Sequence, residues 1–434
     1  MTDESFPEPT GIEEPERPGR RLSSRLRSVA VDTAPLRESP EYRRLYLGDA
    51  VSTIGTQMTA VVVPLQVFEL TKSSLVVGLV SLAGLVPLIV FGLIGGSIAD
   101  AMDRRKLLLV TSSGLALVSV LLFVQAALGL DQVWLLFVLV FLQAGLFAVD
   151  SPARRAVIPR LIPQRQIPAA TALSQVSWTF AMVVGPVLAG GIVGAFGLSA
   201  AYGLDAVTFA AALWAIVSLR AVPPEGGGTA AGLRSVMEGL SFLRSRPVLL
   251  MTFAVDINAM VFGMPRALFP ELALERFHGD STTVGLMHSA VAVGALLGAL
   301  TSGWSGRVRR QGIAVLVAVA AWGAAIVGFG LASVLWLGLL MLALAGAADM
   351  VSAVFRNAIL VAATPDELRG RLGGVFIAVV AGGPRLGDVE AGAAASLVSA
   401  QFSVVSGGFA CILGVVVLAL LAPSFARYEA PDDG

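Results

Sequence analysis

The sequence predicts an all-α integral membrane protein with twelve transmembrane helices, arranged as two pseudo-symmetric six-helix bundles. Apolar residues make up 56% of the 434-residue chain and charged residues only 14%, a balance that a soluble protein of this size could not bury. The apolar residues gather in twelve runs, each long enough to cross a bilayer as a helix. The two halves of the chain also share residues at a fixed offset, which indicates an internal duplication.

The twelve predicted spans alternate with short connections. They lie at 45–69, 75–99, 107–129, 133–156, 168–193, 199–219, 248–272, 283–303, 313–331, 334–357, 373–399 and 404–422. The longest internal connection, 220–247, divides them into an N-terminal half at 44–219 and a C-terminal half at 248–422. Apolar residues at helical spacing within 233–243 predict an amphipathic helix at the inner membrane surface.

The ends of the chain are polar. Residues 1–43 are rich in Pro, Glu, Asp and Arg, and we expect a disordered cytoplasmic tail there, with a second tail at 423–434. Of the thirty Lys and Arg residues, all but Lys72, Arg266, Arg276 and Arg385 fall on the side of the N-terminus. This asymmetry predicts a multi-pass protein of the cell membrane with both termini in the cytoplasm.

The duplication appears as two sets of matching positions. At an offset of 207 residues, Ser74, Val77, Gly78, Leu79 and Gly96 recur as Ser281, Val284, Gly285, Leu286 and Gly303; at an offset of 202, Glu69, Arg154, Ala156 and Pro163 recur as Glu271, Arg356, Ala358 and Pro365. Parallel repeats of this kind imply a pseudo-two-fold axis along the membrane normal and a binding site at the midplane between the halves.

The turn between the second and third spans carries a compact charged motif. Gly96 and Asp100 precede Arg104 and Arg105 within it. One interpretation is an ordinary basic turn. The other is that Asp100 is a cytoplasmic gate charge that pairs with a cation or a helix N-terminus elsewhere.

Charged residues inside spans are costly and mark candidate pathway positions. Spans 1, 4, 7 and 10 each hold a carboxylate, which are Asp49, Asp150, Asp256 and Asp349. The predicted spans put Asp49 and Asp150 near the cytoplasmic surface, where Asp150 and Arg154 form an i, i+4 pair at the gate. Asp256 lies ~12 Å inside its span, close to the midplane. It is either a lone carboxylate that carries a proton or a member of a structural pair.

Further polar residues join this candidate pathway. Gln57 lies in span 1 and Arg266 in span 7, while Asp349 and Arg356 share one face of span 10 and are expected to pair. Span 11 holds Arg385, Asp388 and Glu390 after the helix-breaking Pro384. Arg385 and Asp388 are spaced to neutralise each other, whereas Glu390 has no evident partner. These groups either contact a polar or anionic substrate or close the interface between the halves.

The spacing Gly96-x-x-x-Asp100, followed by Arg104-Arg105-Lys106, resembles the loop signature of the major facilitator superfamily. Ala101 and Asp103 depart from it, because the signature has Arg and Gly at these positions. The resemblance implies the major facilitator fold, in which the first and fourth helices of each half line a central cavity.

Two more stretches narrow the resemblance. Asp150-Ser-Pro-Ala-Arg-Arg and the residues up to Leu173 resemble the loop between spans 4 and 5 in the subgroup that contains the enterobactin exporter. In span 5, Gly185, Pro186, Gly190 and Gly191 resemble the Gly-Pro-x-x-Gly-Gly element of drug–proton antiporters. The resemblance covers about Arg43 to Tyr428 and implies proton-driven efflux.

We therefore expect a secondary active exporter that moves a small molecule, a siderophore or a hydrophobic drug, in exchange for protons by alternating access. A general multidrug pump, an importer of the same fold and a non-transporting membrane sensor are the alternatives. The sequence contains no nucleotide-binding loop, metal-ligand cluster or nucleophile–base pair, so we expect neither an enzyme nor a cofactor or metal. The expected partners are the substrate, protons and lipid, without nucleic acid, and the expected state is a monomer.

Overall fold

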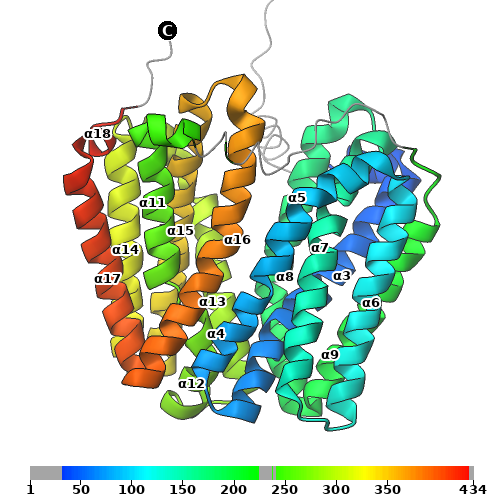
Figure 1. Ribbon diagram of the computed structural model, residues 1–434, viewed down its shortest axis with the longest axis horizontal. Helices are drawn as coiled ribbons and strands as arrows, with labels where there is room; N and C mark the ends of the chain where they lie inside the picture. Colours follow the sequence, from blue (N-terminus) through cyan, green and yellow to red (C-terminus); the bar gives the residue numbers. More distant parts are fainter. Residues whose placement is uncertain (1–31, 224–236, 238–240, 430–434) are drawn as a thin grey trace, which may run out of the picture.

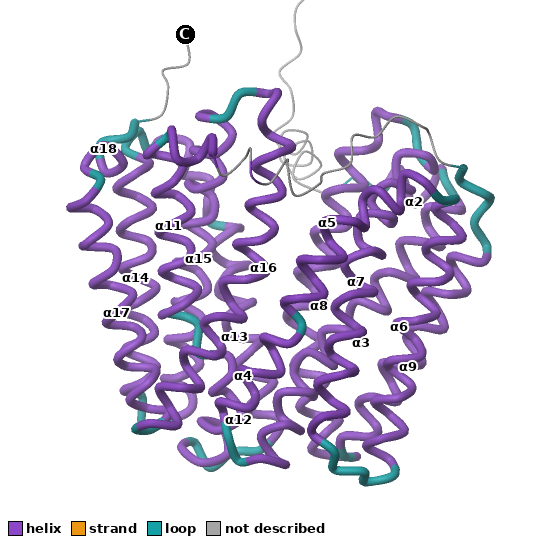
Figure 2. The backbone as a smooth tube through the Cα atoms, viewed as in Figure 1, coloured by secondary structure: helices purple, strands orange, loops and turns teal. Residues whose placement is uncertain are grey.

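The computed structural model describes residues 32–223, 237 and 241–429, without the side chains at helical positions 93, 95–97, 99–101, 366–371, 373, 374, 377 and 378. Every regular element in this part is a helix (Figure 2). Long helices run side by side in two bundles (Figure 1). Residues 1–31 and most of the predicted amphipathic helix at 233–243 lie outside the described residues, although 241–245 is helical.

The N-terminal bundle holds the first six spans. They are α3 (Pro40–Thr71), the consecutive pair α4 (Ser74–Ala83) and α5 (Leu85–Ala101), α6 (Arg104–Ala127), α7 (Val133–Leu161), α8 (Ile167–Phe196) and α9 (Leu198–Val217). The short helix α2 (Ala34–Glu38) precedes them, and the 3₁₀ turn η1 (Gln164–Gln166) leads into α8.

The C-terminal bundle holds the other six spans. The seventh span starts as α11 (Pro247–Phe262) and continues through η2 (Arg266–Leu268), α12 (Phe269–Glu271) and the π-helical turn η3 (Leu272–Arg276). The others are α13 (Ser281–Leu300), α14 (Gln311–Leu331), α15 (Leu335–Ala363), α16 (Asp366–Leu397) and α17 (Ala400–Leu421), with η4 (Ser302–Arg307) after α13 and α18 (Pro423–Ala426) at the end. In the described part, eleven segments are long and apolar enough to cross a membrane, and the more charged α16 makes the twelfth.

Several helices extend beyond the predicted spans. The helix α3 begins at Pro40, five residues before the predicted start, because the Ser39 side chain accepts a 3.2 Å hydrogen bond from the Tyr42 backbone N–H and Pro40 fits the first helical position. Residues 34–38 and 40–43 are therefore helical, and the prediction of disorder is wrong for them. At the other end, α18 occupies part of the predicted tail and buries Phe425.

The two bundles meet near one end of their helices. We call this end the loop side, because the short connections at 128–132 and 332–334 lie there; the opposite end, where α3 begins and α17 ends, is the terminal side. The bundles come together at the loop side and diverge toward the terminal side (Figure 1). Glycines permit the close approach, since a Cβ at Gly78 of α4 would collide with the Asp388 carbonyl of α16 and one at Gly285 of α13 with the Pro186 carbonyl of α8.

Candidate functional site

The N-terminal bundle contains an arginine held between two carboxylates. Arg154 of α7 lies 2.9 Å from Asp150 on the same helix and 3.3 Å from Asp49 of α3. Asp150 also accepts hydrogen bonds of 2.6 Å and 3.1 Å from the hydroxyls of Thr111 and Ser112 on α6. This N-terminal triad of Asp49, Asp150 and Arg154 links α3 to α7, and its hydroxyl contacts add α6. The i, i+4 geometry of its α7 pair is as predicted.

The C-terminal bundle contains a corresponding cluster, which we call the C-terminal triad. Arg356 of α15 forms an ion pair with Asp256 of α11 and lies 3.5 Å from Asp349 on its own helix. The structure thus contains the expected pairing of Asp349 with Arg356. The interpretation of Asp256 as a lone carboxylate is wrong, because the guanidinium of Arg356 contacts it directly.

The two triads lie at matching positions of the repeat. Asp49 and Asp256 each follow the first residue of their helix by nine positions, about 13 Å along the axis. Arg154 and Arg356 each precede the last residue of their helix by seven positions. The expectation that Asp49 is much closer to the surface than Asp256 is therefore wrong, since it rested on a predicted start of the first span five residues too late.

The seventh span breaks where Arg266 stands. After α11 ends, the carbonyl of Gly263 accepts a 2.8 Å hydrogen bond from the indole N–H of Trp322 on α14. The N–H of Ala267 donates a 3.2 Å hydrogen bond to the Asp388 carboxylate of α16. These contacts satisfy backbone groups that the break leaves open, as the membrane interior requires. Arg266 is half-buried, and its side chain forms no hydrogen bond or ion pair among the described residues.

Polar contacts between the bundles concentrate at the loop side. Asp388 accepts a 2.6 Å hydrogen bond from the Ser81 hydroxyl of α4, and Glu271 of α12 accepts one from Ser74. On the other side of the interface, Ser281 of α13 donates a 2.9 Å hydrogen bond to the Gly190 carbonyl of α8. Carboxylates thus take part only on the α4 side of this described interface, while the α8 side uses backbone carbonyls.

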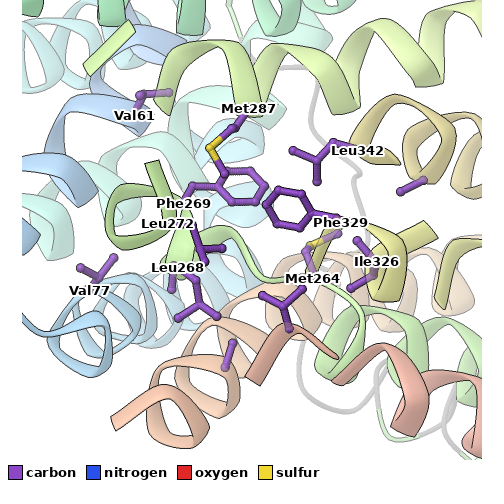
Figure 3. Close-up of a cluster of buried hydrophobic side chains, with 14 of the residues drawn as sticks. Val61, Val77, Met264, Leu268, Phe269, Leu272, Met287, Ile326, Phe329 and Leu342 are labelled. Atoms are coloured by element: carbon purple, nitrogen blue, oxygen red, sulfur yellow. The ribbon is translucent and has the colours of Figure 1, made fainter. Parts of the chain in front are cut away.

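A buried apolar cluster lies behind these polar contacts (Figure 3). Phe269 of α12 packs edge-on against Phe329, with ring centroids 6.0 Å apart, and Val61 and Val77 join the cluster from the N-terminal bundle. Burial of this apolar surface holds the segment that follows Arg266 in place and seals the loop side between the bundles.

The helix α8 contributes the antiporter-like element. Gly185 packs against Gln57 of α3, so that a Cβ there would lie 2.7 Å from the Gln57 Cβ. Gly190 faces α13, whereas Gly191 has open space around its Cβ position. This element therefore packs one bundle together and also forms part of the interface between the bundles.

The predicted gate is described only in part. Gly96 and Asp100 lie on the helical backbone of α5, but their side chains are outside the described part of the structure. Arg104 is buried and donates a 3.2 Å hydrogen bond to the Ala156 carbonyl, and Arg105 donates one of 2.7 Å to the Val217 carbonyl. The two arginines thus tie α6 to α7 and α9.

In the part of the chain that the structure describes, Arg385 and Asp388 of α16 form no ion pair with each other, although their charges interact. Arg385 donates a 2.6 Å hydrogen bond to the Ala381 carbonyl, while Asp388 uses Ser81 and Ala267 as described above. Glu390 is half-buried, and its side chain makes no hydrogen bond to the described residues. The span-11 residues therefore belong to the loop-side interface through Asp388.

Sequence reasoning missed two buried polar groups of the N-terminal bundle. Asp205 of α9 is fully buried and accepts hydrogen bonds from Thr59 and Ser119, the former at 2.8 Å. Gln66 and Gln125 exchange hydrogen bonds of 3.0–3.1 Å. A single carboxylate in the apolar sixth span is a signal that could have identified Asp205. Among the described residues, no three or more His, Cys, Asp or Glu side chains group to hold a metal ion.

Among the described residues, twelve spans in two bundles, joined by glycine contacts at one end and carrying arginine–carboxylate clusters at membrane depth, define a transporter of the major facilitator superfamily rather than an enzyme. The chain matches the transmembrane secretion effector family over residues 30–431 and belongs to that family.

Named relatives and solved structures agree with this assignment. The chain is 27% identical over 405 residues to the enterobactin exporter EntS of Citrobacter koseri, covering 93% of this chain and 97% of that protein. It is also 27% identical over 403 residues to the enterobactin exporter EntS of Escherichia coli O157:H7, covering 93% and 96%.

The fold is shared with transporters of low sequence identity. A bacterial homologue of the human lysosomal transporter Spinster, in an inward-facing and unoccupied conformation, superposes with a TM-score of 0.66 at 15% identity, covering 91% of this chain and 97% of that one. A POT family transporter in complex with 5-aminolevulinic acid superposes with a TM-score of 0.71 at 13% identity, covering 89% and 97%.

Proposed function

We propose that this transporter is a proton-driven exporter of a small molecule, a siderophore or a hydrophobic compound, working by alternating access in the cell membrane with both termini cytoplasmic. One observation carries the proposal. The arginines of both triads find their carboxylate partners within their own bundle, whereas the bundles touch through glycines, apolar side chains and hydroxyls that donate to carboxylates or backbone carbonyls. Each bundle can therefore move as a unit without breaking its ion pairs.

Similarity and local chemistry support the proposed direction of transport and the proposed cargo. Relatives at 27% identity over almost the whole chain are named enterobactin exporters, which supports export and a siderophore-like cargo. Arg266 supports a cargo with acidic or hydrogen-bond-accepting oxygen atoms, because its guanidinium forms no hydrogen bond or ion pair with the described residues and offers a fork of N–H donors. Arg385 and Glu390 on α16 are further candidate contacts, and general multidrug efflux is the alternative.

Everted membrane vesicles test this proposal directly. Vesicles from cells that express the chain are energised by respiration and offered either enterobactin, as a catecholate siderophore, or ethidium, as a hydrophobic drug. We expect accumulation of enterobactin that collapses when nigericin dissipates the pH gradient, and none in vesicles without the protein. Accumulation of ethidium alone would favour multidrug efflux, and accumulation unaffected by nigericin would contradict proton coupling.

Cysteine labelling tests the orientation. In a Cys411→Ala background, Leu130→Cys at the loop side should react with an impermeant maleimide added to intact cells. Gly227→Cys in the linker should react only after the cells are opened. Labelling of Gly227→Cys in intact cells would overturn the orientation.

A further inference from the structure

The two triads share an arrangement that the repeat alone does not require. In each, the arginine pairs closely with a buried carboxylate and more distantly with a partly open one. Asp150 and Asp256 are the buried members, with side chains 5% and 7% exposed. Asp49 and Asp349 are the open members, at 39% and 44% exposed and at 3.3 Å and 3.5 Å from their arginines.

The open carboxylates lie on different helices of the repeat. Asp49 belongs to α3, the first span of its half, while Asp349 belongs to α15, the fourth span of its half. The repeat position of Asp49 in the second half is occupied by Asp256, which is buried. The two halves thus reach the same pattern with the open carboxylate on different helices, so that in each triad one carboxylate is buried and one is accessible.

The charge balance of each triad gives this pattern a consequence. Two carboxylates share one guanidinium, so a fully ionised triad carries one surplus negative charge at membrane depth, where an uncompensated charge is costly. In the N-terminal triad, the only other side chains that hydrogen-bond to these carboxylate oxygens among the described residues are Thr111 and Ser112, and Tyr42, a neutral phenol, lies near Asp49. These neutral groups do not remove the surplus.

Among the described residues, one further cation acts on the C-terminal triad, which is Arg266. The guanidinium of Arg266 acts electrostatically on Asp349, on Asp388 and on His288 of α13. Asp388 shares this cation from α16, and both of its oxygens are already occupied by Ser81 and Ala267. Arg266 therefore serves two carboxylates, and it forms no ion pair with Asp349 among the described residues.

We propose that each triad is a proton-binding site that holds one exchangeable proton, loaded through Asp49 in the N-terminal half and through Asp349 in the C-terminal half. The transporter then carries up to two protons per cycle. The tightly paired Asp150 and Asp256 keep the arginines in place and do not exchange protons with solvent. This inference deepens the proposed proton coupling, but proton binding is a property of the protein alone and does not depend on any cargo.

Carbodiimide labelling of the wild-type chain tests the assignment without any substitution. Dicyclohexylcarbodiimide reacts with protonated carboxyl groups that it can reach, and mass spectrometry locates the product. With purified protein in detergent, we expect modification of Asp49 and Asp349 that declines as the pH rises, and none of Asp150 and Asp256. Modification of the buried pair in preference to the open pair would overturn the proposal.

A proton count tests the number of sites. The purified full-length chain is titrated with acid across the neutral pH range, and proton uptake per molecule is compared between variants that retain a single gel-filtration peak. Asp49→Asn and Asp349→Asn should each lose one proton and the double variant two, while Asp131→Asn in an exposed loop should lose none. No loss in either single variant, or a loss of only one proton in the double variant, would overturn the proposal.

Discussion

The contact between Gly190 and α13 makes the closed loop side sensitive to a single methyl group. An ideal Cβ at Gly190 would lie 2.5 Å from the Ser281 carbonyl oxygen and 2.8 Å from the Thr282 Cα, both of them backbone atoms of the opposite bundle. The neighbouring Gly191 lies on the same helix and has no atom within 4 Å of its Cβ position. Gly190→Ala and Gly191→Ala therefore form a matched pair.

The size of the expected shift between open and closed molecules follows from the location of the clash. Overpacking by one methyl group costs about 1–3 kcal/mol, and it arises only while the loop side is closed. The gain in helix propensity on replacing glycine by alanine, about 1 kcal/mol, applies to both conformations and cancels in their ratio. We expect Gly190→Ala to raise the ratio of loop-side-open to loop-side-closed molecules by about 5- to 150-fold.

Double electron–electron resonance measures this ratio from the distribution of distances between two spin labels. Spin labels at Leu130→Cys and Val334→Cys, one exposed loop-side position in each bundle, are introduced into the Cys411→Ala background. The longer-distance population should grow in Gly190→Ala and remain unchanged in Gly191→Ala. If Gly190→Ala folds normally and retains the parent distance distribution, or if Gly191→Ala shifts equally, the reasoning is refuted.

Three further outcomes are expected. Arg356→Gln should lower the free energy of unfolding by about 3–5 kcal/mol, because it leaves Asp256 buried without its cation. The double variant Asp256→Asn/Arg356→Gln should regain part of this loss, as measured by thermal unfolding in detergent, and a double variant no more stable than Arg356→Gln would contradict the pairing. Ser81→Ala removes a donor to Asp388 and should weaken the closed loop side by about 1.5–3 kcal/mol, visible in the same spin-label distances; unaltered distances would mean that this bond is not a latch. Asp100→Asn should leave insertion intact but cut transport sharply, and normal transport would reduce Asp100 to an ordinary turn residue.

The helices and their order could be predicted because apolar length alone specifies membrane spans. Their ends could not, since the cap formed by Ser39 and Pro40 is a local signal outside the apolar run. This error of five residues changed the apparent depth of Asp49 relative to Asp256. Depth inferred from a hydropathy boundary therefore carries the full uncertainty of that boundary.

The pairing inside the site was only partly accessible from the sequence. Asp349 and Arg356 are close in sequence and on one helix face, so their contact could be predicted. Asp256 and Arg356 are one hundred residues apart, and only the tertiary arrangement of α11 and α15 brings them together. The repeat nevertheless contained this information, because Asp256 and Arg356 occupy the positions of Asp49 and Arg154 at the two offsets.

The break in the seventh span has a consequence for how the loop side could open. In an uninterrupted α-helix, the carbonyl of Gly263 would accept a hydrogen bond from the N–H of Ala267, four residues later. The side chains of Trp322 and Asp388 now bind these same two groups separately. Straightening of the span would exchange both external partners for one internal bond and release Asp388 from the segment beside the Ser81 contact. The indole of Trp322 would lose its acceptor in the same step, so its fluorescence offers an intrinsic optical signal for the kinked and straight forms of the seventh span.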